Sequence, residues 1–415
     1  MRNRIIYNNV GLLTGPSPAF QVHSGTNGES KLTSLNLVQA SSFDMALNRA
    51  DVKQIGGTRL AARQAVTQPS VSLGFSYLLT DGINEKTLGF NVAGETSFLS
   101  GVTGNDDRNF FLFVSEKAQT DFNLQSGFSN MDVLSFGNCY VNNYSLEASV
   151  GTLPSVSVDY SACNVRFDQT SGTNTHLYRP SGPEHIVASG TIPAINRENG
   201  TLAQDAQQAG LSEGYGYTVK RESIADGGIF NTGDTKYLAP GDIELMLSNP
   251  NIGGIRLSGD LKMHVQSVAI NIPINRTDLM GFGSKYVYDR RAEYPTLGQM
   301  QISATANHIV TGHSHAIFSK DDDYQMEILF KKGTTDNVLT KFQDAKIVSE
   351  SISQSIGSNM SFDATFSFEC SPTKGFLFRA CSGRRRLSYA RGWVNPNITA
   401  NNLPGLSFVK VISVN

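Results

Sequence analysis

The chain has 415 residues, with 34 Lys and Arg against 36 Asp and Glu, and a formal net charge of -2. This balance excludes a protein that holds nucleic acid or an anionic membrane mainly through its net charge. The length exceeds what one hydrophobic core usually fills, so two domains are expected. The opening residues contain no apolar stretch long enough for a secretory signal, and no run of about 18 apolar residues occurs anywhere. We therefore expect a soluble protein that is made in a cytoplasm.

Most of the recognisable pattern along the chain is that of β-strands. The segments SVSVDY (155–160) and FDATFSFE (362–369) alternate apolar and polar residues, which is the period of a strand with one buried face. Glycine and short polar turns separate such runs, and helical periodicity is scarce. Short helices are expected at 202–210, where Thr201 can cap the start, and near 95–101. The sequence therefore predicts a mainly β protein.

One phrase of the sequence occurs twice. NRADVKQIGG (48–57) and NRTDLMGFGS (275–284) share Asn-Arg, Asp and Gly at an offset of 227 residues. With a shift of one residue, Pro-Ser-Val at 69–71 meets Pro-Thr-Leu at 295–297. Four matching blocks in one order predict a duplicated domain, and two copies are too few for a solenoid. The other two blocks keep the same apolar positions with few identities, and they match 105–114 to 321–330 and 136–160 to 342–366.

The duplication gives the expected domain organisation. Two tandem domains are separated by a polar, glycine-rich segment and followed by a tail. Two like domains in one chain can occupy equivalent places in a symmetric assembly, so the duplication favours an architectural role. The predicted segments are an N-terminal segment at 1–32, a first domain at 33–167, a linker or insertion at 168–257, a second domain at 258–372 and a C-terminal extension at 373–415.

In each copy the repeated phrase falls between two predicted strands, in a segment that we interpret as a long loop. Loops of about two dozen residues are usually functional or disordered. The matched glycines favour an ordered loop with turns at Gly56 and Gly283. The matched arginine and aspartate indicate a pair used for holding or docking. The alternative is a local salt bridge that stiffens an exposed loop.

Each copy resembles the tail tube protein family of long-tailed bacteriophages (siphophages). The resemblance rests on the order of a strand, a long N-R-x-D-x-x-x-x-G loop, a P-S-V or P-T-L strand, an acidic turn with an FFLFV or MEILF strand, and a hairpin that begins at F-G-N and ends at S-V-S-V. The tandem arrangement is similar to that of major tail tube proteins with two fused tube domains. The resemblance implies two β-sandwich or half-barrel tail-tube domains, each with a short flanking helix.

The resemblance also implies a function. Members of this family form stacked rings of six tube domains around a DNA channel, so three chains with two domains each would complete a homotrimeric, pseudo-hexameric ring. The implied protein is a structural component of the virion tail, made in the cytoplasm of a bacterial host. Its implied partners are copies of itself, tape measure, terminator and baseplate proteins, and double-stranded DNA in passage through the lumen. On the same resemblance, loops at 44–68 and 271–294 would join successive rings. The residues expected at these contacts are Asn48, Arg49, Asp51, Gly56, Gly57, Asn275, Arg276, Asp278, Gly281 and Gly283.

A basic strip near the C-terminus has two interpretations. Three consecutive arginines stand in SGRRRLSYARGW, close to a tyrosine and to the only tryptophan. Arginine among aromatic residues favours docking onto another subunit. Contact with DNA or phosphate is the alternative. The predicted docking strip comprises Arg384, Arg385, Arg386, Tyr389 and Trp393.

No motif in the sequence predicts catalysis. GFGSK (281–285) lacks the spacing of a phosphate-binding loop, and the acidic triplet 321–323 lacks that of a calcium loop. His313 and His315, with His308 nearby, could hold a metal from one strand face, and a plain polar face is the alternative. The four cysteines form no C-x-x-C pair and are interpreted as buried thiols. We expect no enzymatic activity, no cofactor and no bound metal.

Two other classes of protein stay open. A β-rich carbohydrate-binding tail protein would place several aromatic side chains in a groove, and the single tryptophan argues against that class. Another tail component, such as a terminator, a baseplate ring or a decoration protein, would share the β-rich composition. Only the mode of assembly separates this second class from a tube protein.

Overall fold

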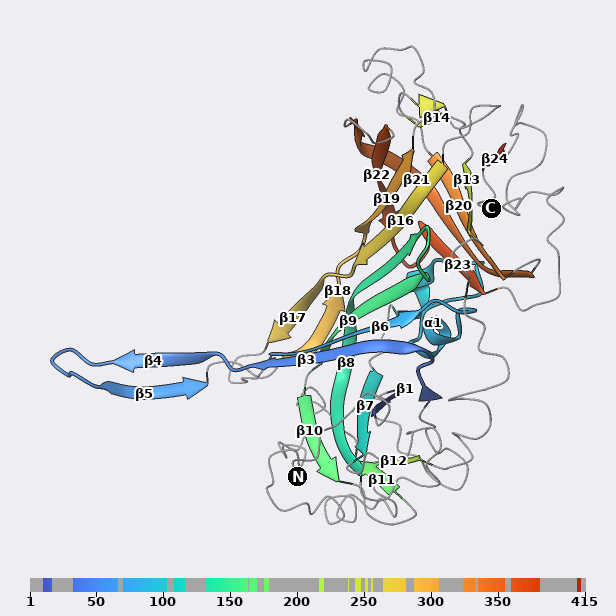
Figure 1. The fold of residues 1–415 in the computed structure, drawn as a ribbon. Coiled ribbons are helices and arrows are strands. Elements are labelled where there is room, and N and C mark those ends of the chain that lie inside the picture. The colour runs from blue at the N-terminus through green and yellow to red at the C-terminus, as the bar shows by residue number, and fades with distance from the viewer. Residues whose placement is uncertain are drawn as a thin grey trace.

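The fold is described from a computed structural model. The described residues are mainly β-strand, as the sequence predicts (Figure 1). They are residues 10–16, 33–65, 70–102, 108–115, 131–162, 164–169, 175–178, 216–219, 238, 243–247, 251–252, 255–256, 264–280, 287–305, 324–332, 335–354, 360–380 and 409–411.

The described elements fall into two halves that are related in pattern. The first half, residues 10–169, contains the helices α1 (Ile83–Thr87) and η2 (Phe98–Val102) and the strands β1 (Val10–Pro16), β2 (Thr33–Ser34), β3 (Val38–Ala46), β4 (Arg49–Lys53), β5 (Leu60–Ala65), β6 (Ser70–Leu78), β7 (Arg108–Ser115), β8 (Met131–Ser149), β9 (Ser155–Ala162) and β10 (Asn164–Gln169). The second half, residues 243–380, contains β13 (Ile243–Leu247), β14 (Asn251–Ile252), β15 (Ile255–Arg256), β16 (His264–Pro273), β17 (Arg276–Met280), β18 (Val287–Ala292), β19 (Thr296–Thr305), β20 (Tyr324–Lys332), β21 (Thr335–Ser353), β22 (Ser361–Cys370) and β23 (Phe376–Ala380). Outside them lie β11 (Thr175–Tyr178), β12 (Gly216–Val219) and β24 (Val409–Val411).

Two long strands, β8 and β21, connect three sheets. The shared sheet runs in the order β3-β6-β9-β8-β16-β19-β22-β21 and crosses from one half to the other at β8–β16. The outer sheet of the first half runs β2-β1-β7-β8-β10, and that of the second half runs β24-β13-β20-β21-β23. Each long strand passes from its outer sheet into the shared sheet at a residue with a left-handed backbone. These residues are Asn138 of β8 (φ 49) and Asp344 of β21 (φ 52). Asn and Asp tolerate this conformation better than most other residues.

The two halves repeat the pairing registers as well as the strand order. A β-bulge interrupts β3–β6 between Val38 and Ala40, and a bulge interrupts β16–β19 between Val265 and Ser267, which are 227 positions later. A bulge is a specific local insertion, so its recurrence at matched places is strong evidence of equivalent strands. The other matched shifts are Val141/Asn143 with Ile347/Ser349, and Arg108/Phe110 with Tyr324/Met326.

The repeated pairing extends beyond the segments that the sequence suggested. Thr14 of β1 faces Phe110, and Leu247 of β13 faces the equivalent residue, Met326. Strands β10 and β23 likewise take equivalent places beside β8 and β21. Thus β1 lies in the predicted N-terminal segment, β13 in the predicted linker and β23 in the predicted C-terminal extension. The predicted bounds of 33–167 and 258–372 enclose only the middle of each pattern.

The predicted match of 69–71 with 295–297 is one residue out of register. Asp44 faces Ser72, and 227 positions later Asn271 faces Gln299, so the offset does not change between these strands. The buried positions agree, because Val71 of β6 corresponds to the buried Gly298 of β19. A shift of one residue would move every side chain to the opposite face of the sheet. The proline common to both segments therefore does not mark the register.

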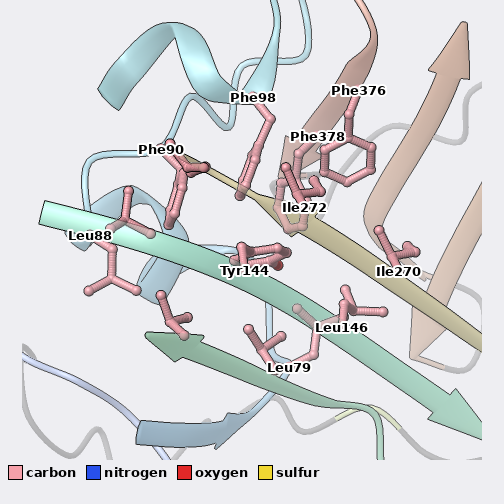
Figure 2. Packing of buried hydrophobic residues seen from close by; sticks show 14 of the residues in the cluster. Leu79, Leu88, Phe90, Phe98, Tyr144, Leu146, Ile270, Ile272, Phe376 and Phe378 are labelled. Atoms are coloured by element: carbon pink, nitrogen blue, oxygen red, sulfur yellow. The ribbon is translucent and has the colours of Figure 1, made fainter. Parts of the chain in front are cut away.

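One hydrophobic core runs through both halves. At the place where they meet, Phe98 of η2 packs on Phe376 and Phe378 of β23, with ring centroids 5.3 Å apart in both pairs, and on Tyr144 of β8 at 4.8 Å (Figure 2). Phe90 stacks on Phe98 at 4.3 Å. Each such aromatic pair is worth about 0.5–1.5 kcal/mol beyond its buried area. This junction cluster therefore fixes the segment with η2 in the first half against β23 in the second.

The helices differ from their predicted positions. The helix expected near 95–101 is the short 3-10 helix η2, and α1 was not predicted. Helix α1 has only five residues and begins after Gly82 (φ 85) without a side-chain cap, so it offers neither periodicity nor a capping signal. The helix expected at 202–210 lies outside the described residues, as does the segment 306–323 between β19 and β20.

Glu85 of α1 is a buried carboxylic acid in this part of the core. The Tyr77 hydroxyl donates a hydrogen bond to its Oε1 at 2.8 Å. Burial raises the pKa of Glu85 to about 7, although the hydrogen bond from Tyr77 acts in the opposite direction. The folded protein therefore holds this proton more tightly than the unfolded chain, where the ordinary value is 4.5.

The stability of the isolated chain should fall as the pH rises through this range. The stabilisation from protonated Glu85 is complete below the unfolded pKa and is lost as the pH passes about 7, which corresponds to roughly 3 kcal/mol. We expect the Glu85→Gln variant to lose this fall, as measured by urea denaturation between pH 5 and pH 8. The exposed Glu147→Gln variant is the control and should keep it. An unchanged pH dependence in Glu85→Gln would contradict the assignment.

Candidate assembly surfaces

The two predicted stacking loops are β-hairpins. Strands β3 and β6 extend to Ala46 and Ser70, and beyond them β4 and β5 form a two-stranded ribbon that projects away from the rest of the fold (Figure 1). In the second half, β17 and β18 form the equivalent ribbon. The sequence suggested loops because the repeated phrase falls between two predicted strands and shows no strand alternation of its own. A ribbon of two strands needs no buried face, since its backbone groups pair across the hairpin.

Each hairpin carries the same ion pair across its strands. Arg63 Nε lies 2.7 Å from Asp51 Oδ1, and Arg290 Nε lies 2.9 Å from Asp278 Oδ1. Both pairs are directly opposed in register and both residues of the second pair follow the first by 227 positions. The aspartates therefore make local salt bridges, which was the alternative interpretation. Their partners Arg63 and Arg290 were missed, although the same offset would have found them.

The two arginines of the repeated phrase lie in different surroundings. Arg49 is exposed. Arg276 is partly buried, and its Nε donates a hydrogen bond to the Val141 carbonyl oxygen at 3.3 Å, while its guanidinium carbon lies 4.9 Å from the centre of the Tyr140 ring. Burial also lowers the pKa of Arg276. Arg276 thus attaches the base of the second hairpin to β8 of the first half.

The other predicted stacking residues are only partly described. Asn48 is exposed, and Gly56 (φ 82) and Gly57 form the turn of the first hairpin, where the Gly57 amide donates to the Gln54 carbonyl at 3.2 Å. The carbonyl of Asn275 accepts a hydrogen bond from the Glu293 amide at 2.9 Å. The predicted residues outside the described part of the chain are Gly281, Gly283, Arg384, Arg385, Arg386, Tyr389, Trp393, His308, His313 and His315.

The first hairpin carries apolar side chains on its exposed end. Ile55 at the turn is fully exposed, and Val52 and Leu60 beside it are also exposed. A monomer gains nothing from apolar groups at the tip of a projecting ribbon, whereas a neighbouring molecule can cover them. The hairpin is therefore a candidate contact surface.

The shared sheet has one buried face and one polar face. Ser145, Asn271 and Gln299 line a depression on the polar face, across β8, β16 and β19. Strand alternation places serine, threonine and acidic residues beside them. The only lysine on this face of the described strands is Lys346, where β21 enters the shared sheet. The carboxylates of the face are Asp44, Glu147, Asp159, Asp363 and Glu369.

Two of the four cysteines lie in the described part of the chain. Cys139 and Cys370 are buried, and burial raises the pKa of the Cys370 thiol to about 12. Cys163 and Cys381 lie outside the described residues. Within the described ranges, no helix is long and apolar enough to cross a membrane.

Among solved structures, a phage tail tube resembles part of this chain. The chain is similar to the SPP1 tail tube, known from a hybrid solid-state NMR and cryo-electron microscopy structure, with 12% sequence identity and a TM-score of 0.28. The match covers 41% of this chain and 82% of the SPP1 chain. No protein-family model matches the sequence, and no curated protein matches it. At this TM-score the similarity supports no functional conclusion by itself.

The Arg276 contacts predict a difference between the two equivalent arginines. Arg276→Ala removes a hydrogen bond from a charged donor and a cation–π contact, so it should lower the free energy of unfolding by about 1–3 kcal/mol. Arg49→Ala is the matched control and should change it by less than about 0.5 kcal/mol, because Arg49 is exposed. Urea denaturation of both variants measures the difference, and equal effects would contradict the assigned contacts.

Proposed function

We propose that this chain is a structural tail protein that assembles into the tube of a bacteriophage tail. The observation that carries the proposal is that the two halves repeat the same strand pairings and bulges. The two halves also join edge to edge in one shared sheet, through β8 and β16. We take this recurrence as a domain duplication with copies at about 10–169 and 243–380. The outer strands of the shared sheet, β3 and β21, stand at its two ends, where further copies can be added.

The same edge-to-edge pairing of sheets, repeated between chains, would close a ring. If each chain supplies two like units side by side, three chains supply the six units of a ring of the tail tube family that the sequence resembles. The result would have a true threefold axis and an approximate sixfold arrangement. Exposed sheet edges, which are an aggregation hazard in a monomer, would then become the joints of the ring.

The polar face of the shared sheet fits the lumen of such a tube. It carries carboxylates such as Asp159 and Asp363, with a single lysine among its described residues. Each phosphate neutralised by Lys or Arg would add affinity for DNA, so a face with few cations would let DNA pass without holding it. We assign no catalytic role to this face or to any other described surface.

Electron microscopy of the purified protein tests the proposal. We expect rings of three chains that stack into hollow tubes, as seen by cryo-electron microscopy at high protein concentration. Six chains in each ring, or a chain that stays monomeric at every concentration, would overturn the proposal. Rings that never stack would instead identify another tail component, such as a terminator or a baseplate ring.

The apolar end of the first hairpin generates a separate prediction about stacking. If β4 and β5 reach the next ring, Ile55→Asp should place a charge in that contact and prevent elongation, while single rings still form. The melting temperature should not change, because Ile55 is fully exposed in the monomer. Negative-stain images compare the lengths of tubes from variant and parent. Tubes of normal length would exclude this hairpin from the contact.

A further inference from the structure

The junction inside the chain provides a template for contacts between chains. There β16 pairs antiparallel with the second part of β8, with Ile270 opposite Leu146 and Ala269 opposite Glu147. Ile270 is 1% exposed and Leu146 0% exposed, so the pairing closes the core beneath it (Figure 2). The Ile274 amide continues the contact by donating to the Asn142 carbonyl at 2.7 Å.

Both strands of this junction have equivalents at the ends of the shared sheet. The registers relate β16 to β3 at an offset of 227, and β8 to β21 at an offset of 206. Within the described residues, β3 pairs only with β6, and the second part of β21 pairs only with β22. The two strands that would repeat the junction are therefore the two open edges of the sheet.

The side chains at these edges are exposed where their equivalents are buried. Phe43 of β3 corresponds to Ile270 and is 46% exposed, and Ile352 of β21 corresponds to Leu146 and is 44% exposed. The same difference holds for Met45 of β3 and for Leu47 just after the end of β3, whose equivalents Ile272 and Ile274 are buried. An edge with a row of half-exposed apolar side chains lacks a partner that its equivalent has.

We propose that β3 of one chain pairs antiparallel with the second part of β21 of another copy, in the register of the junction inside the chain. This inference rests on the proposed duplication and names its closing contact. Transferring the β8–β16 register places Phe43 opposite Ile352 and Ser42 opposite Ser353. The remaining pairs of the described residues are Ser41 with Gln354, Asp44 with Ser351, Met45 with Glu350, and Ala46 with Ser349.

A second surface supports the same partner. Strand β10 corresponds to β23, since Phe167 faces Leu134 as Phe378 faces Thr340. Phe378 is fully buried against Phe98 of the neighbouring half. Phe167 is 70% exposed. The contact between two copies would therefore cover Phe167 as the junction cluster covers Phe378.

The edge contact differs from the internal junction in two residues. Lys346 and Glu350 of β21 stand where β8 has Tyr140 and Tyr144. The cation–π contact of Arg276 on Tyr140 therefore has no counterpart between chains. Charged side chains at an edge strand disfavour pairing with unrelated strands, so they restrict the open edge to a partner of matching register.

Cysteine cross-linking tests the register. Directly opposed residues of an antiparallel pair have β-carbons about 4.5–5.5 Å apart, so Ser42→Cys with Ser353→Cys should form disulfides between chains on mild oxidation. We expect covalent species up to the trimer on a non-reducing gel. The matched control, Ser42→Cys with Ser349→Cys, moves one cysteine along the strand by about 13 Å and should give little cross-linking. Each single variant controls for pairing with the four native cysteines.

A charge at the apolar contact tests the same interface without cysteines. Phe43→Lys should leave the chain folded but monomeric by light scattering, whereas Leu297→Lys, an exposed apolar position on the polar face of β19, should assemble as the parent does. Assembly of Phe43→Lys like the parent would overturn the proposal.

The outcomes separate this inference from the proposed function. Rings that form without the Ser42–Ser353 cross-link, or with equal cross-linking of the control pair, would overturn the register and leave the tail-tube role standing. Cross-linked trimers that never stack would support the edge contact and contradict the tube. A chain that neither cross-links nor forms rings would overturn both.

Discussion

The backbone pairing of β8 with β16 is the contact on which the rest of the structure depends. It makes one sheet out of two, so that the strands of both halves share a buried face and a single core. The junction cluster around Phe98 and the hydrogen bond from Arg276 to Val141 add further contacts between the two halves. Without β16, the second part of β8 would be an open edge like that of β21.

The equivalent strands β8 and β21 of the shared sheet have different roles, since β8 pairs with β16 and β21 ends the sheet. Where the contact is permanent, β8 presents Tyr140 and Tyr144, and the latter is buried among aromatic rings. Where the edge is open in the monomer, β21 presents Lys346 and Glu350. Apolar residues still mark both edges, as Phe43 and Ile352 do. The open edge thus combines apolar side chains, which favour burial by a partner, with charged side chains, which disfavour pairing with unrelated strands.

Much of the fold could be predicted from the sequence, because two periodicities were visible. Alternation in 155–160 and 362–369 identified strands, and the repeated N-R-x-D phrase gave the offset that relates the halves. The equivalence of β1 and β13 could not be predicted, because VGLLTGP and IELML share a place in a sheet and almost no sequence. The two strands are equivalent only in their pairing, since β1 pairs with β7 and β13 pairs with the corresponding strand β20.

The candidate surfaces were predictable in position but not in form. The segments around 44–68 and 271–294 were interpreted as long loops between strands, whereas each contains a two-stranded hairpin. A ribbon of two strands lacks the alternation of buried and exposed residues that identifies a strand of a packed sheet. The partners of the two aspartates, Arg63 and Arg290, lie on the returning strand of each hairpin, outside the repeated phrase. The burial of Arg276 depends on contact with β8, more than a hundred residues away in sequence, which no local pattern records.

The left-handed residues Asn138 and Asp344 have a consequence for mechanics. Each lets one continuous strand leave an outer sheet and enter the shared sheet, so the two layers of each half are joined by covalent backbone as well as by side-chain packing. Packed layers alone can slide past one another, because apolar contacts have no preferred direction. A wall made of such units would resist shear through its thickness with the strength of the polypeptide chain itself, while hydrogen bonds between strands resist its opening along the sheet.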